Sequence, residues 1–171
     1  MTLRLSASQD IRAPAGLVFG LVSTPERLPE WNTSVAAARR AMPEQPVCRG
    51  SRAIMSGRLL GQVLESETEV VEFEPPSTFA TRAIRGPRLH TAFRVDSTAS
   101  GTRLRVDVSG EVPGGRLGGM LAEGFLRTEL RASLERLRQL AEREAQLAAA
   151  SEPLEGGDPA CWLHLEESRG D

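Results

Sequence analysis

Side chains that could do acid–base or metal chemistry are few in this chain. Its only histidines are His90 and His164, and its only cysteines are Cys48 and Cys161. Cys161 and His164 form a C-x-x-H pair, which alone is half of a zinc site. We therefore expect no metal and no cofactor, and reduced thiols in place of a disulfide framework.

The basic chemistry of the chain depends on arginine. All 21 basic residues are arginine, and the sequence contains neither lysine nor tyrosine. Schiff-base chemistry on lysine and acid–base chemistry on tyrosine are therefore excluded. No P-loop and no G-x-S-x-G nucleophile motif occurs either.

Two residues are candidates for catalysis, and the catalytic residues are otherwise unknown. If Phe79, Thr81 and Ala83 face outward, Arg82 points into the interior, where it could bind a carboxylate or an enolate. His90 follows an apolar residue of inward phase, so strand alternation places it on the outer side.

Three glutamates, Glu65, Glu67 and Glu69, share one phase of a long predicted strand. Carboxylates in one row usually face water, so we expect the intervening side chains to point inward: Ser66, Thr68 and Val70. A glutamate turned into an apolar cavity would instead be a candidate general base, and this alternative stays open.

The elements that would position these residues begin with a strand and two short helices. "LRLSASQDI" alternates apolar and polar residues up to Pro14, which predicts a strand. "PAGLVFGLVS" has helical spacing, and "TPERLPEW" predicts a second short helix that ends at Trp31. A tryptophan in so polar a stretch needs a structural or functional reason.

Six further strands are predicted between Val35 and Gly110. Turn signals such as "EPPS" and "STASGT" separate them at hairpin spacing, so the sheet should be antiparallel. The expected ranges are 34–41, 50–57, 60–73, 78–86, 89–96 and 102–110. In the last two strands the apolar phase is clear, with six side chains facing inward: Leu89, Phe93, Val95, Leu104, Val106 and Val108.

One long amphipathic helix is predicted over 117–148, with a stripe through Leu126, Leu130, Leu134, Leu137 and Ala141. Its first turns, "LGGMLAEGF", contain three glycines, each of which lowers helix propensity by roughly 1 kcal/mol relative to alanine. We therefore expect that end to be interrupted or loosely packed.

Length and charge indicate one domain with an appendage. We expect a domain over 1–148 and an acidic, mostly flexible tail over 149–171 that contains the apolar "CWLHL" segment. The tail has six acidic residues and one arginine, whereas the whole chain has a formal charge of −2. No apolar run long enough for a membrane span or an export signal occurs, so we expect a cytoplasmic protein.

The order of these elements and several ordered motifs resemble a known superfamily. "APAGLVFGLVSTPERLPEWNTSV", "EVVEFEPPSTFATRAIRGP" and "TAFRVDSTASGTRLRVDVSG" are similar to the SRPBCC, or START-like, superfamily in its polyketide cyclase/dehydrase branch. The resemblance implies an α+β helix-grip fold, in which a curved antiparallel seven-stranded sheet wraps a long C-terminal helix. It also implies a deep apolar cavity between sheet and helix.

The expected ligand-binding residues combine that implied cavity with the strand phases. Trp31 should lie at the cavity rim, where its ring lines or covers the pocket together with the first turns of the long helix. The alternative is a ring that only fills the core. The full expected set is Trp31, Val70, Leu89, Thr91, Phe93, Val95, Val106, Leu117, Met120 and Leu121.

The leading functional interpretation is binding of a small hydrophobic ligand, polyketide- or lipid-like. A polyketide aromatase/cyclase or dehydratase acting in the same cavity is the alternative, and a partner-binding protein that uses its tail is the third. We expect a small apolar molecule as partner. We expect no nucleic acid, because the arginines of the sheet fall mostly opposite the apolar phase, lack interleaved aromatics and belong to a mildly acidic chain. We expect no membrane, because no long apolar run occurs. Whether the chain forms a homodimer stays an open question.

Overall fold

The computed structural model describes residues 2–59, 61–111 and 115–151. The chain begins with strand β1 (Thr2–Ile11), helix α1 (Ala15–Ser23), a 3₁₀ turn (Pro25–Arg27) and helix α2 (Leu28–Trp31). Six strands and one long helix follow: β2 (Val35–Arg40), β3 (Arg52–Leu59), β4 (Gln62–Glu74), β5 (Thr78–Arg85), β6 (Leu89–Thr98), β7 (Gly101–Glu111) and α3 (Gly115–Ser151). The α+β helix-grip fold and its element order are as predicted.

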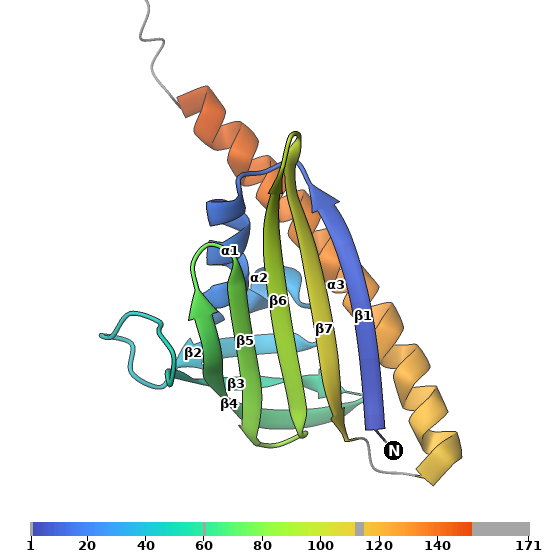
Figure 1. Ribbon diagram of the computed structural model, residues 1–171. Helices are drawn as coiled ribbons and strands as arrows, with labels where there is room; N and C mark the ends of the chain where they lie inside the picture. Colours follow the sequence, from blue (N-terminus) through green and yellow to red (C-terminus); the bar gives the residue numbers. More distant parts are fainter. Residues whose placement is uncertain (1, 60, 112–114, 152–171) are drawn as a thin grey trace, which may run out of the picture.

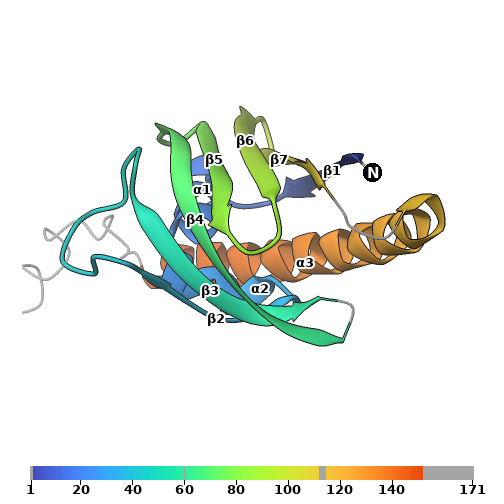
Figure 2. The ribbon, with the colours of Figure 1, turned by 90° about the horizontal axis from the view of Figure 1, so that it is seen from below.

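All seven strands form one antiparallel sheet in the order β1-β7-β6-β5-β4-β3-β2. Only β1 departs from simple hairpin order, since it pairs with β7 at the far edge. Figure 1 shows β2, β3 and β4 crossing the other strands at a steep angle, and Figure 2 shows the sheet curling around α3. Register shifts between β4 and β5 contribute to this bend, because a bulge increases local twist.

Strand alternation determines which side chains face the helix. In β6 and β7, Phe93 lies opposite Val106 and Val95 opposite Leu104, and all four are buried. Arg94 and Arg105, one residue away, are exposed on the outer face. One face of the sheet is therefore apolar and buried, and the other is exposed to solvent, as the sequence pattern predicted.

Helix α3 packs its apolar stripe into the concave face of the sheet. Leu134, Leu137 and Ala141 are buried and belong to the main core, with Phe19 and Phe79 from α1 and β5. The phenyl rings of Phe19, Phe73, Phe79 and Phe93 form edge and stacked contacts that connect α1 with three strands. The core thus lies at one end of the sheet, over the C-terminal half of α3.

The start of α3 differs from the expectation drawn from its glycines. The helix is continuous from Gly115 to Ser151 and is not interrupted. Figures 1 and 2 show its first turns projecting past the sheet, where Met120 and Leu121 are 66% and 73% exposed. The Met120 and Leu121 side chains therefore face solvent, whereas Ala122, the next residue, is 2% exposed.

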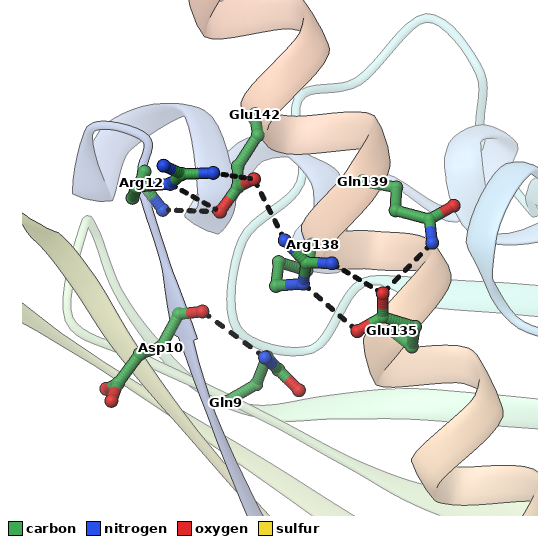
Figure 3. Close-up of polar contacts among 7 residues, drawn as sticks. All are labelled: Gln9, Asp10, Arg12, Glu135, Arg138, Gln139 and Glu142. Carbon is green, nitrogen blue, oxygen red and sulfur yellow. Dashed lines mark hydrogen bonds and ion pairs between the residues drawn. The ribbon is translucent and has the colours of Figure 1, made fainter.

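A polar network fastens the other half of α3 to the end of β1 (Figure 3). The backbone N–H of Arg12 donates to Oε1 of Glu142 at 3.1 Å, and Arg138 donates to Oε2 of Glu142 at 3.0 Å. The Glu142 side chain is only 11% exposed. The Arg12 backbone hydrogen bond, together with the Arg12 and Arg138 guanidiniums, holds the pKa of Glu142 below its usual range.

This network predicts a loss of stability at acidic pH. A carboxylate with a lowered pKa in the folded state stabilises the fold above its unfolded pKa, and that contribution is lost as pH falls through the folded pKa. We expect the free energy of unfolding of the wild-type protein to fall below pH 4.5. Glu142→Gln should lose stability at pH 7 and show a weaker acid dependence in urea titrations.

Glu123→Gln is the matched control for that experiment. Glu123 pairs with Arg127 four residues along the same helix, on a more exposed surface where such pairs contribute little. An acid dependence that is identical in the wild type and in Glu142→Gln would contradict the assigned role of Glu142.

Residues 152–171, which include the "CWLHL" segment, lie outside the described residues, and the predicted boundary at 148 falls three residues before the end of α3. No helix of the described part is long and apolar enough to cross a membrane.

Candidate functional site

A cavity of about 250 Å³ lies between the concave face of the sheet and α3. Most of its wall is apolar and comes from all seven strands, α2 and α3. The apolar lining residues are Leu5, Trp31, Val35, Met55, Leu64, Ala83, Pro87, Leu89, Phe93, Val106, Val108, Leu126 and Leu130. The arrangement can enclose a small apolar molecule.

Trp31 forms the part of the wall between the cavity and the core. Its side chain is 2% exposed, its ring meets Phe93 edge-on at 6.2 Å between centroids, and its Nε1–H donates to the carbonyl oxygen of Leu21 at 3.1 Å. The tryptophan therefore fills the core and also lines the cavity, so the two alternatives drawn from the sequence are not exclusive. Its only polar atom has a partner, as burial of an indole requires.

An ion-pair cluster fixes α2 and Trp31 against α3. Arg27 donates to Glu30 at 2.7 Å and also to Glu144 of α3. Hydrogen bonds from the Arg27 guanidinium hold the pKa of both carboxyls below the usual range. The residues that follow α2 are thereby positioned at the edge of the cavity.

Hydroxyl-bearing residues on neighbouring strands also line the cavity wall. They are Ser56, Ser66, Thr68, Thr81 and Thr91. Ser66 lies opposite Met55 and Thr68 opposite Ala53, so the inward phase of β4 is the one that the glutamate row predicted. Glu65 is exposed, and Glu67 and Glu69 form ion pairs with Arg52 and Arg82.

A carboxylate enters the cavity wall from the helix. Glu129 of α3 lines the cavity, and its Oε2 accepts hydrogen bonds from the hydroxyls of Thr33 at 2.6 Å and Ser34 at 3.2 Å. Ser133, one turn further along α3, accepts from the backbone N–H of Thr33 at 3.1 Å. The loop between α2 and β2 is thus joined to the helix at this point.

Glu129 was not among the residues expected from the sequence. It lies one residue before Leu130 of the apolar stripe, and three residues after Leu126. Together with Ser133 it forms an i, i+4 polar pair beside that stripe, but Glu123 and Glu135 also have polar partners four residues on, so this spacing alone does not single out Glu129. Arg58, whose side chain is exposed, contributes the other charged residue of the lining.

Five of the expected ligand-binding residues line the cavity: Trp31, Leu89, Thr91, Phe93 and Val106. Val70 and Val95 are buried in the core and do not line it. Met120 and Leu121 are exposed and are not among the lining residues; of the α3 side chains that the structure describes, those from Leu126 onward meet the cavity. The Leu117 side chain lies outside the described residues.

Neither catalytic candidate lies in the cavity wall. Thr81 and Ala83 line the cavity, so Arg82 points to the outer face, where it is paired with Glu69 at 3.7 Å. His90 is opposite Arg82 in the ladder and also lies outside the lining. The expectation that Arg82 could enter the cavity is corrected by this strand phase.

A second hollow, of about 320 Å³, is located beside the network of Figure 3. Its charged lining residues are already neutralised by partners: Glu142 by Arg12 and Arg138, and Asp10 by Arg103 at 2.8 Å. This hollow fits a structural role. Among the described residues, no group of three metal-ligating side chains occurs.

The family described as "Polyketide cyclase / dehydrase and lipid transport" matches residues 2–142. The chain belongs to this family. That assignment confirms the superfamily resemblance, and the seven-stranded sheet around a long helix agrees with it. No curated protein matches the chain.

Solved structures of the same fold include a Zhui aromatase/cyclase from a Streptomyces species, with a TM-score of 0.68 and 15% identity over 86% of this chain and 98% of that one. The di-domain ARO/CYC protein BexL has a TM-score of 0.65 and 22% identity over 82% of this chain and 50% of that one. A major latex-like protein from Panax ginseng has a TM-score of 0.56 and 14% identity over 77% of this chain and 97% of that one. Similarity at these identities demonstrates a shared fold.

Proposed function

We propose that this member of the polyketide cyclase/dehydrase and lipid transport family binds a small hydrophobic ligand, polyketide- or lipid-like, in the cavity between sheet and α3. The observation that carries the proposal is the cavity of about 250 Å³ with its predominantly apolar wall. An apolar cavity with a few polar groups is the usual form of a small-molecule site.

Native mass spectrometry of the protein purified from its own host tests this proposal. We expect a bound small molecule that is lost on denaturation, and saturable one-to-one binding of an apolar naphthalene probe by the emptied protein. Absence of both a co-purified molecule and probe binding would overturn the proposal.

A second candidate function is that of a polyketide aromatase/cyclase or dehydratase, and Glu129 favours it. A carboxylate on the cavity wall could remove a proton from a methylene between two ketones of a bound poly-β-ketone. The resulting enolate would attack a second carbonyl of the same chain, and the aldol hydroxyl would leave with a proton as water. The test is incubation with a poly-β-ketone mimic, in which the wild type should release water from the substrate and Glu129→Gln should not.

A further inference from the structure

Glu129 differs from the other glutamates of α3 in the side chains that contact its carboxylate. Among the described residues of this helix, four glutamates are paired with arginine: Glu123, Glu135, Glu142 and Glu144. Glu129 forms no such ion pair within the described part of the chain, and it is the glutamate that lines the cavity. Within the described residues, the side chains that donate hydrogen bonds to its carboxylate are the hydroxyls of Thr33 and Ser34.

Those hydroxyls leave half of the Glu129 carboxylate available. Thr33 and Ser34 both donate to Oε2, and Oε1 accepts no hydrogen bond from the part of the chain that the structure describes. An ionised carboxylate accepts hydrogen bonds at about four positions and donates none. The Thr33 and Ser34 contacts therefore orient the carboxylate and leave Oε1 able to accept a hydrogen bond from another donor.

A ligand that fills the cavity must remove water from this carboxylate. Loss of that hydration is costly unless the ligand supplies a replacement donor. A ligand carboxylate would instead place a second negative charge beside Glu129. An ammonium group would match the charge, but it would carry a large dehydration cost into a wall formed mainly by groups such as Leu126, Leu130 and Phe93.

We propose that Glu129 selects an apolar ligand with a neutral hydroxyl group, phenolic or enolic, which donates a hydrogen bond to Oε1 while the apolar body lies against the sheet. This inference rests on the proposed ligand-binding function and names the ligand class that the same cavity takes. Glu129 is then a specificity-determining residue, held in orientation by Thr33 and Ser34.

Three naphthalene probes of similar size separate the alternatives. 2-Naphthol carries the donor, 2-methoxynaphthalene lacks it, and 2-naphthoate carries a negative charge. Dissociation constants would be measured by isothermal titration calorimetry. We expect the wild type to bind 2-naphthol about 10-fold or more tightly than 2-methoxynaphthalene, the range typical of a hydrogen bond to a charged group.

Two substitutions test whether Glu129 causes that preference. Glu129→Gln keeps the shape of the side chain and removes its charge, so the preference for 2-naphthol over 2-methoxynaphthalene should become smaller. In Glu129→Leu the dissociation constants of the two probes should differ by no more than about 2-fold. 2-Methoxynaphthalene should bind these variants at least as tightly as the wild type. Glu123→Gln removes a carboxylate from the same helix outside the cavity lining and should keep the full preference.

The outcomes separate the two proposals. If the wild type binds both neutral probes equally, or binds 2-naphthoate best, the inference about the ligand class is overturned and the proposed ligand binding survives. If Glu129→Gln, with circular dichroism like that of the wild type, retains the full preference, Glu129 is not its source. If no probe binds and no molecule co-purifies, the proposed function itself fails.

Discussion

Trp31→Ala is expected to lower the free energy of unfolding by about 3–5 kcal/mol, the range for truncating a large aromatic side chain in a core. The indole is 2% exposed and packs edge-on against Phe93. Its removal also leaves the Leu21 carbonyl oxygen without the Nε1–H donor at 3.1 Å. Urea denaturation followed by circular dichroism measures the change.

Trp31→Phe is the matched variant for this experiment. It keeps an aromatic ring and loses the N–H donor and part of the volume, so we expect a loss of about 1–2 kcal/mol. A ring that only covered the cavity mouth would give a loss of about 1–2 kcal/mol even for Trp31→Ala, with altered probe affinity. That result would contradict the core role of Trp31.

The strands were predictable because the sequence shows where each strand ends and which of its side chains face inward. Turn residues separate them, and the alternation in β6 and β7 gives the inward set correctly: Phe93, Val95, Leu104 and Val106 are buried, and the half-buried Leu89 and Val108 line the cavity. The glutamate row of β4 likewise indicated that Ser66 and Thr68 point inward. These are local signals, so sequence alone carries them.

The errors concern long-range geometry. Met120 and Leu121 were expected in the wall because the cavity was expected to reach the glycine-rich start of the helix. They lie on the surface, whereas Ala122, one turn before Leu126, is buried. Phase was undecided in β5, because both Arg82 and Ala83 fit a strand, and only pairing with β4 and β6 resolves it.

Glu129 was missed for a related reason. A glutamate beside an apolar helical stripe usually faces solvent, and nothing local distinguishes it from Glu123 or Glu135. Its place in the cavity depends on Thr33 and Ser34, about a hundred residues earlier in the chain, which receive it at the end of α2. The polar part of the site is therefore a product of the tertiary fold.

Filling the cavity from within is the most direct test of the account. Ala83 of β5 lines the cavity, whereas its neighbour Ile84 is 40% exposed and belongs to the opposite strand phase. Ala83→Phe places a phenyl ring in the space that a ligand would occupy. Ile84→Phe adds a ring of similar size on the outer face and serves as the control.

The affinity for 2-methoxynaphthalene is the quantity to measure, by calorimetry, in both variants, with circular dichroism as the check on folding. We expect Ala83→Phe to weaken binding more than about 10-fold, a change of about 1.4 kcal/mol, and Ile84→Phe to leave it unchanged. A folded Ala83→Phe variant that binds the probe as tightly as the wild type would contradict the assignment of this cavity as the ligand site.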